Sequence, residues 1–353
     1  MNAFQLVDKS TGGSIKNDLL SGITVALALV PEAVAFAFVA GISPIVGLYG
    51  AFMMGLVTGF FGGRPGMISG STGAMAVVIV NLVKGGNQLG NSDTAGLQYL
   101  FITLLLVGII QMGAGVLRMG KFVRMIPHSV MMGFVNGLAI VIFISQLGMF
   151  KSQGEWIHGM SLYLMIGLVG ITMIIMIFLP MLTKKIPAAL TAILVVTSIV
   201  VFGDLETQTV LSFIQANGGE GIKAGLPTFS IPSVPFSLNT FIFIAPYALI
   251  LAAIGLIESL MTLNLIDELT DSHGNGNREC VAQGAGNFIN GLFGGMGGCA
   301  MIGQSIINIK SGGRGRLSGI FAALTLLTFV LFGSGFIEQV PIAALVGVMF
   351  MVV

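Results

Sequence analysis

The sequence predicts an all-α membrane protein that crosses the bilayer many times. Of its 353 residues, 55% are hydrophobic and only 8% are charged, whereas soluble domains carry about 25% charged residues. Apolar runs such as 97–117 and 162–182 approach the ~20 residues that span a bilayer. Such runs recur along the whole chain. Water therefore cannot be the main solvent of this protein.

Breaks at charged residues and at Gly/Pro clusters divide the chain into twelve apolar segments. The first six are expected at 19–40, 42–62, 67–83, 97–117, 127–149 and 160–182. The second six are expected at 186–202, 237–266, 278–293, 299–309, 317–336 and 341–353. The third and tenth are unusually short. Residues 1–18 are polar and lack the form of a cleavable signal, so the first segment is expected to direct insertion.

The distribution of basic residues predicts that the N-terminus is cytoplasmic. If each segment crosses in turn, twelve lysines and arginines fall on the inside. Only Lys84, Lys151 and Lys223 fall on the outside. This is the asymmetry of the positive-inside rule. We therefore expect a multi-pass protein of the cell (inner or plasma) membrane, with residues 1–18 in the cytoplasm.

An internal repeat predicts two inverted halves. Phe-Phe-Gly-Gly at 60–63 recurs as Leu-Phe-Gly-Gly at 292–295, each time before a short segment; the alternative is chance in a chain with 51 glycines. The copies are seven segments apart, so they point in opposite directions through the bilayer. We expect a first seven-span repeat at 19–203, an extracytoplasmic linker at 204–236 and a second repeat of about five spans at 237–353. The chain ends inside an apolar run, which predicts a fragment or a shortened protein.

Few ionisable residues lie inside the predicted segments, where each costs about 2.5–3.5 kcal/mol. Glu258 has Thr262 one turn away and is expected to exchange a proton, or to hold a sodium ion with Thr262 and backbone carbonyls. The alternative is a structural pair with a neighbouring helix. Glu32 follows Pro31, so it either satisfies backbone donors that the proline frees or takes part in function. His128 is interpreted as an interfacial residue, with a proton relay as the alternative.

The two short segments predict half-helices that begin at mid-membrane. The start of a helix presents free N–H groups and the positive end of its dipole. Two such starts facing each other attract an anion without a buried lysine or arginine. One half-helix is expected to begin at 71–74 and the other at 299–302. Their small residues equally suit close helix packing in lipid.

Other chemistries find no support in the sequence. Cys280 and Cys299 lie far from each other, so they offer neither a disulfide framework nor a CxxC metal site. No HExxH, nucleophile elbow, P-loop or Rossmann fingerprint occurs in a suitable context. We expect no enzyme activity, no cofactor, no nucleic-acid partner, and no metal other than sodium at Glu258 and Thr262.

With these motifs the sequence resembles the sulfate permease (SulP) family of inorganic anion transporters, over essentially the whole chain. The residues that carry the resemblance in the first half are NDLLSG at 17–22, VPEA at 30–33, GISPIVGLY at 41–49 and GGRPGMISGSTGA at 62–74. Those in the second half are ESL at 258–260, NRE at 277–279, FGGMGGCAM at 293–301 and NIKSGGR at 308–314.

The resemblance implies a seven-plus-seven inverted-repeat fold, here with an incomplete second repeat. In this fold a core domain carries the substrate past a gate domain, in an elevator-like movement. The anion is expected between the starts of the third and tenth helices, beside the first and eighth. The substrate residues carried over are Pro31, Glu32, Ser71, Thr72, Gly73, Cys299, Ala300 and Met301. The coupling residues are Glu258 and Thr262. Family members are commonly dimers, so a homodimer is expected, and many end in a STAS domain, which this sequence lacks.

The resemblance leaves several functions open. The first hypothesis is proton symport of sulfate, with Glu258 as the coupling group. The family also has members for bicarbonate, dicarboxylates and halides. Sodium-coupled bicarbonate members typically have aspartate at the position of Glu258, which favours protons here. The alternatives are a sodium-coupled bicarbonate transporter, a passive anion channel, or a fragment that does not transport.

Overall fold

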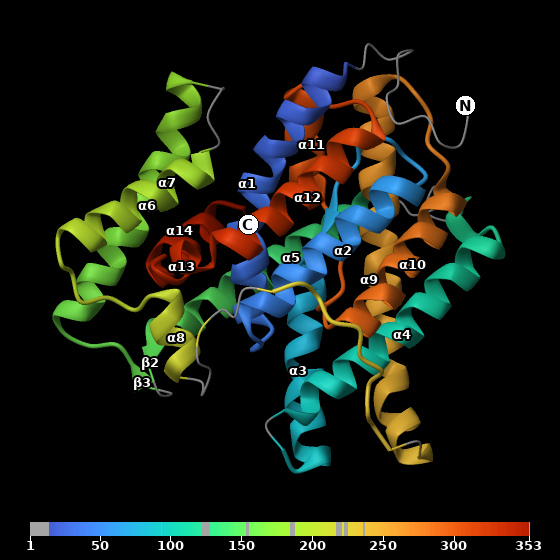
Figure 1. Cartoon of the computed structure of the whole chain (residues 1–353), viewed down its shortest axis with the longest axis horizontal. Helices are drawn as coiled ribbons and strands as arrows, with labels where there is room; N and C mark the ends of the chain where they lie inside the picture. Colours follow the sequence, from blue (N-terminus) through green and yellow to red (C-terminus); the bar gives the residue numbers. More distant parts are fainter. Residues whose placement is uncertain are drawn as a thin grey trace. The chain divides into compact units, whose positions relative to one another are not determined.

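A computed structural model describes residues 14–92, 94–121, 128–152, 155–183, 188–216, 221, 225–235 and 237–352. These residues form an all-α fold (Figure 1). The first seven helices are α1 (Ile15–Val39), α2 (Pro44–Phe61), α3 (Gly73–Gly90), α4 (Ala95–Val116), α5 (His128–Leu147), α6 (Met160–Leu182) and α7 (Ala188–Phe202). The next seven are α8 (Val210–Ala216), α9 (Leu238–Thr270), α10 (Gly276–Phe293), α11 (Ile302–Lys310), α12 (Arg316–Phe332), α13 (Ser334–Glu338) and α14 (Ile342–Val352).

Four two-residue strands accompany the helices. They are β1 (Ser69–Gly70), β2 (Lys151–Ser152), β3 (Glu155–Trp156) and β4 (Cys299–Ala300). β2 pairs with β3 in an antiparallel arrangement, and β1 pairs antiparallel with β4 from the other end of the sequence. The second pairing positions the candidate site described below.

Five helices in the described part of the chain, α1, α2, α4, α6 and α9, are long and apolar enough to cross a membrane. The apolar helices α7, α12 and α14 are shorter. The predicted segment 160–182 coincides with α6. The fold class predicted from the sequence is therefore confirmed at the level of a bundle of apolar helices.

Several predicted segments differ from the helices in a way that backbone chemistry explains. The third and tenth segments, expected at 67–83 and 299–309, begin as extended strands, and their helices start only at Gly73 and Ile302. Each strand contains or adjoins glycine, which disfavours a helix interior. The segment expected at 317–336 is broken at Gly333 into α12 and α13. The segment expected as linker contains α8.

The chain divides into two compact units. Unit 1 comprises Met1–Met131 and Leu226–Thr328, and unit 2 comprises Met132–Gly225 and Phe329–Val353. Unit 1 contains α1 to α4, α9 to α11, most of α12, and the β1–β4 pair. Unit 2 contains α6 to α8, α13, α14 and most of α5. Each unit therefore takes helices from both halves of the sequence.

Close helix packing in unit 1 depends on small residues. A Cβ added at Gly284 of α10 would lie 2.7 Å from the carbonyl oxygen of Gly108 in α4. A Cβ added at Gly291, two turns further along α10, would lie 2.6 Å from the carbonyl oxygen of Phe101. Such contacts let backbones approach closely, as is typical of helices packed within a membrane. They hold α10, which has a polar face, against the apolar helix α4.

Connections that the basic residues assign to the cytoplasm lie together at one end of unit 1. Asp18 Oδ1 accepts a hydrogen bond from Arg314 N at 2.8 Å. The Arg316 guanidinium donates to the Gly62 carbonyl at 2.7 Å. Asn275 N donates to the Gly63 carbonyl at 3.0 Å. These contacts join the first turn of α1, the chain after α2, the chain before α10 and the chain between α11 and the start of α12.

Candidate functional site

The centre of the candidate site is the antiparallel pairing of β1 with β4. Ser69 pairs with Ala300 and Gly70 with Cys299. Met301 N extends the ladder by donating to the Ile68 carbonyl at 2.9 Å. The pairing satisfies the backbone of two extended segments that would otherwise leave polar groups unpaired at membrane depth. It also brings together two helix starts that are distant in the sequence.

The two helices that follow the strands begin next to the pairing. Thr72 is the N-cap residue of α3 and Met301 is that of α11. Neither helix start has a hydrogen bond from a capping side chain. The first N–H groups of a helix have no partner within the helix and carry the positive end of its dipole. The arrangement thus offers two sets of backbone donors suited to a small anion.

Space in front of α11 is provided by a glycine. Gly303, in the first turn of α11, is exposed, and a Cβ added there would meet no atom within 4 Å. Ser71, by contrast, is buried and its hydroxyl donates to the Gly47 carbonyl at 2.7 Å. Ser71 therefore fixes the approach to α3 rather than presenting its hydroxyl proton to a ligand.

Glu258 on α9 reaches the same pairing through Cys299. The Cys299 thiol donates to Glu258 Oε2 at 2.8 Å, and its sulfur lies 3.3 Å from Thr72 Oγ1. Three side chains from α9, β4 and the start of α3 thus form a continuous chain. Among the described residues, Asp267 forms an ion pair with Arg64 and another with His273. Glu258 takes part in neither pair.

Oxygen atoms gather on the side of α9 that faces β4. The Thr262 hydroxyl lies 2.8 Å from the Glu258 carbonyl and 3.4 Å from the Ala300 carbonyl. Ser259 Oγ accepts a hydrogen bond from Ala300 N at 3.1 Å. A carboxylate, a hydroxyl and a carbonyl are the ligand types that hard cations prefer. No cluster of three His, Cys, Asp or Glu suited to a metal occurs among the described residues.

Glu32 approaches the site from α1. Its carboxylate accepts a hydrogen bond from the side chain of Gln304, in the first turn of α11. Both side chains are buried, at 5% and 4% exposure. Pro31, the residue before Glu32, lies inside α1, where it removes one backbone donor from the helix. A carboxylate beside the positive end of α11 is electrostatically favourable, and it competes with any anion for that end.

Polar residues of α10 hold the two strands in place. Asn287 pairs with the backbone of Gly298, immediately before β4, and also donates to Gln111 Oε1 at 2.9 Å. Gln283 donates to Ser69 Oγ at 2.9 Å and to the buried Glu279 at 2.7 Å. These side chains are all fully buried or nearly so. The extended segments are therefore anchored by side chains rather than by a larger sheet.

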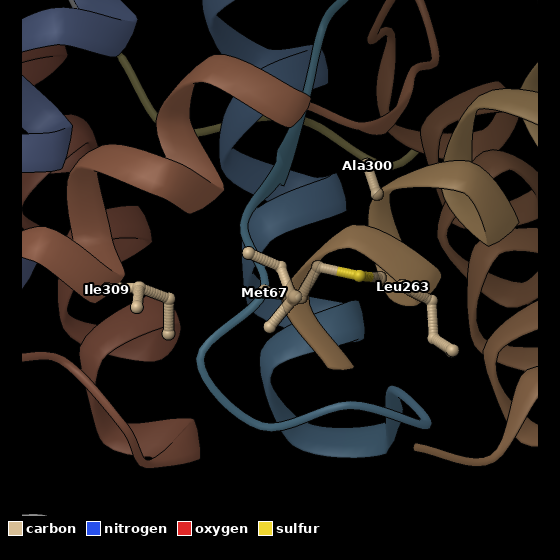
Figure 2. Packing of buried hydrophobic residues seen from close by; sticks show 5 residues of the cluster. Met67, Leu263, Ala300 and Ile309 are labelled. Carbon is tan, nitrogen blue, oxygen red and sulfur yellow. The ribbon is translucent and has the colours of Figure 1, made fainter. Parts of the chain in front are cut away.

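An apolar cluster adjoins the pairing and includes Ala300 of β4. Met67, Leu263, Ile266, Ala300 and Ile309 pack together, each at most 6% exposed. Figure 2 shows Met67 between Ile309 and Leu263, with Ala300 on the same side as Leu263. The cluster takes residues from the chain before β1, from α9, from β4 and from α11. It fixes the tilt of α9 and α11 at the site.

The structure places the residues predicted from the sequence in different ways. Thr72, Gly73, Cys299, Ala300, Met301, Glu258 and Thr262 lie at the pairing or contact it directly. Pro31 and Glu32 lie on α1, and Glu32 reaches the start of α11 through Gln304. Ser71 points to α2 instead. The side chain of His128 lies outside the described residues.

The supporting polar residues were not identified as site residues by sequence reasoning. Asn287, Gln111, Gln283 and Ser259 are uncharged. The high cost of an ionisable residue in a membrane segment, which singled out Glu258, therefore does not single them out. Their one sequence signal is position, because an amide inside an otherwise apolar or glycine-rich segment needs a hydrogen-bond partner. The two cysteines, Cys280 and Cys299, are free and buried.

Comparisons with known proteins identify relatives of the whole chain. The sequence matches the sulfate permease family over residues 15–155 and 152–353. It is 46% identical to "Putative sulfate transporter YbaR" of Bacillus subtilis strain 168, over 96% of this chain and 66% of that protein. It is 34% identical to bicarbonate transporter BicA of Picosynechococcus sp., over 99% of this chain and 63% of that protein.

A solved structure shows the same fold. The transmembrane domain of a cyanobacterial bicarbonate transporter BicA matches with a TM-score of 0.83 and 32% identity, over 96% of this chain and 88% of that one. The chain spans about two thirds or less of the length of the two curated relatives. These relatives are transporters rather than enzymes.

Proposed function

The chain belongs to the sulfate permease family, and from this we propose that it is the membrane part of a secondary transporter for an inorganic anion. Sulfate is the first candidate substrate, because the relative with 46% identity carries that name. The anion would bind between the starts of α3 and α11. One observation carries the proposal: the pairing of Ser69 with Ala300 and of Gly70 with Cys299 brings these two starts together.

The proposed anion ligands are backbone N–H groups. Gly73 begins α3 and Ile302 begins α11, both without a capping side chain. No lysine or arginine is needed, because two helix dipoles and several N–H groups supply the positive potential. Release of the anion remains easy for the same reason, since no full positive charge holds it. Both properties suit a carrier.

The proposed coupling group is Glu258. The Glu258 carboxylate has a thiol as its hydrogen-bond partner and forms no ion pair with another described residue. No ion-pair partner therefore holds the carboxylate in its charged form, so it can take up and release a proton. Its position one side chain away from Thr72 would let proton uptake and anion binding influence each other. The proposed reaction is symport of a proton with the anion. Unit 1 would move as the carrier against unit 2, in the manner of an elevator.

A second candidate is sodium-coupled bicarbonate transport. Bicarbonate as the substrate is favoured by the 34% identity to bicarbonate transporter BicA and by the match to the transmembrane domain of a cyanobacterial BicA. Glu258, Thr262 and the Ala300 carbonyl would then hold the sodium ion. The proposed setting is the same for both candidates: a multi-pass homodimer in the cell membrane with a cytoplasmic N-terminus.

Uptake into proteoliposomes tests both candidates. The purified chain is reconstituted, and uptake of labelled sulfate and of labelled bicarbonate is measured under imposed pH and sodium gradients. Sulfate uptake driven by an inward proton gradient supports the first candidate, and sodium-driven bicarbonate uptake supports the second. No uptake of either anion under any gradient contradicts transport by this chain. Anion current that persists in Glu258→Gln indicates a passive channel instead.

A matched pair of glycine variants tests where the anion binds. Gly303→Val adds a side chain in the first turn of α11, where an added Cβ meets no atom within 4 Å, and it is expected to lower uptake at least tenfold. Gly167→Val on α6 is the control, because that glycine is also exposed and its added Cβ also meets nothing within 4 Å. Equal effects of both variants would contradict a site at the start of α11.

A further inference from the structure

The side chain of Cys299 lies between the anion half-helices and the carboxylate of Glu258. Its sulfur is 2.8 Å from Glu258 Oε2 and 3.3 Å from Thr72 Oγ1. Cys299 is fully buried. Because an ionised carboxylate can only accept, the thiol is the donor in this hydrogen bond. The proton of the thiol therefore points at one of the two carboxylate oxygens that a coupling cation would need.

The surrounding atoms otherwise suit a hard cation. Thr262 Oγ1, the Ala300 carbonyl and the Glu258 carboxylate lie on one side of α9. Sodium, like magnesium and calcium, is a hard cation and takes oxygen ligands, whereas a thiol sulfur is soft and its S–H proton faces the cation with positive charge. The side chain of β4 that contacts the Glu258 carboxylate thus offers a soft sulfur atom where a serine would offer a hard oxygen.

No neighbouring charge changes this balance. The elements packed against α9 are α3, α4, α10, α11 and β4. Among the described residues, the charged side chains on these helices form no ion pair with Glu258; they are Lys84, Arg278, Glu279 and Lys310. The polar side chain that α4 brings to α9 is the uncharged Gln111, which donates to the Ala252 carbonyl. Cys299 is the partner through which the site can distinguish ions.

We propose that Cys299 determines the ion specificity of this site: its thiol excludes sodium from Glu258 and Thr262 and leaves the carboxylate to a proton. The use of the ion in transport rests on the function proposed above. Sodium binding itself does not, because it can be measured on the purified protein without any anion moving. Replacement of the sulfur by a hydroxyl oxygen should therefore create a sodium site.

Thermal unfolding in detergent tests the proposal directly. The Tm is measured while choline chloride is replaced stepwise by sodium chloride at constant ionic strength. We expect no sodium-dependent change for the wild type and a rise of about 2–8 °C for Cys299→Ser, because a ligand that binds only the folded state stabilises it. The rise should disappear in the double variant Cys299→Ser/Thr262→Ala, which removes one oxygen ligand.

The other cysteine provides a matched control. Cys280 on α10 is also buried, at 1% exposure, but it packs against Leu260 and does not contact Glu258. Cys280→Ser should show no sodium response. If Cys299→Ser does not fold, Cys299→Ala replaces it, because loss of the thiol opens Glu258 Oε2 to a sodium ion with its water. A sodium response of the wild type equal to that of the variant overturns the proposal. So does a folded Cys299 variant without any response.

Uptake measurements distinguish a failure of this inference from a failure of the proposed function on which it rests. In proteoliposomes, anion uptake by Cys299→Ser should become dependent on sodium, whereas uptake by the wild type should follow the pH gradient. Failure of both proteins to transport contradicts the proposed function, and the sodium titration of Tm still decides the role of Cys299. Sodium-dependent uptake by the wild type, unchanged in Cys299→Ser, contradicts the role of Cys299 while transport stands.

Discussion

The side-chain amide of Asn287 pairs with both polar groups of Gly298. Asn287 Oδ1 accepts from Gly298 N at 2.9 Å, and Asn287 Nδ2 donates to the Gly298 carbonyl at 3.0 Å. Nδ2 also donates to Gln111 Oε1 at 2.9 Å. The amide side chain takes the place that a neighbouring strand would have. It therefore fixes the backbone before β4 at the position of Asn287 along α10.

Replacement of Asn287 by alanine should destabilise the protein strongly. Three buried groups would lose their partners, and each unsatisfied buried group costs about 1–3 kcal/mol. We expect a loss of at least about 3 kcal/mol in the free energy of unfolding, measured by thermal or denaturant unfolding in detergent. Asn136→Ala is the control, because Asn136 lies exposed on α5. A loss no larger than that of the control would show that the amide pairing carries little energy.

Gly298 should not tolerate any side chain. A Cβ added at Gly298 would lie 1.9 Å from the Gly70 carbonyl oxygen, which is backbone and cannot rotate away. Gly298→Ala is expected to force β1 and β4 apart and to abolish anion uptake. Gly113→Ala on α4, where an added Cβ meets nothing within 4 Å, should keep uptake unchanged. Uptake by Gly298→Ala within twofold of the wild type would contradict the strand pairing.

Removal of the charge of Glu32 should strengthen anion binding. Its carboxylate lies at the start of α11 through Gln304, where its negative charge opposes a bound anion. We expect Glu32→Gln to lower the KM for the anion about tenfold, equivalent to about 1.4 kcal/mol of repulsion. The measurement is initial uptake rate against anion concentration at constant pH. A KM that does not change would mean that Glu32 is uncharged or too far from the anion.

Lysine should not be able to replace Arg316 at the end of α2. Its guanidinium donates to three carbonyls at the end of α2: those of Gly59 at 3.3 Å, Phe60 at 3.2 Å and Gly62 at 2.7 Å. These carbonyls have no partner within the helix, and the negative end of the dipole favours a cation there. Lysine keeps the charge but lacks the planar fork.

We expect Arg316→Lys to lower the free energy of unfolding by about 1–3 kcal/mol, seen as a lower Tm in detergent. Arg118→Lys at an exposed position should leave the Tm unchanged. Equal stability of the two variants would show that charge alone caps α2.

Hydropathy predicted much of the fold because long apolar helices have a strong local signal. α6 has the predicted bounds, and α2, α4 and α10 differ from them by a few residues. α8 and α13 were missed because helices of 7 and 5 residues are too short for a span. Each copy of the Phe-Gly-Gly repeat lies at the end of a helix, α2 at Phe61 and α10 at Phe293, and is followed by a short extended strand.

The partners of the site residues could not be predicted in the same way. The sequence shows Glu258 as a costly charge, but its hydrogen-bond partner Cys299 is 41 residues away and has no polar signal of its own. The same holds for Gln304 and Glu32, separated by 272 residues. Such contacts depend on how helices cross, and a one-dimensional pattern does not contain that information. Charge and hydropathy therefore give the candidates, and only the fold gives their pairing.

The β1–β4 pairing also has a consequence for biosynthesis. Thr72 and Cys299, which meet at this pairing, are 227 residues apart. At about 5–20 residues per second, the ribosome needs more than about ten seconds to make the second partner after the first. During that time the extended segment before α3 has backbone groups without their final partners, which is costly in lipid. The site is thus among the last parts of unit 1 to assemble, and the nascent chain must keep these groups hydrated or shielded until β4 arrives.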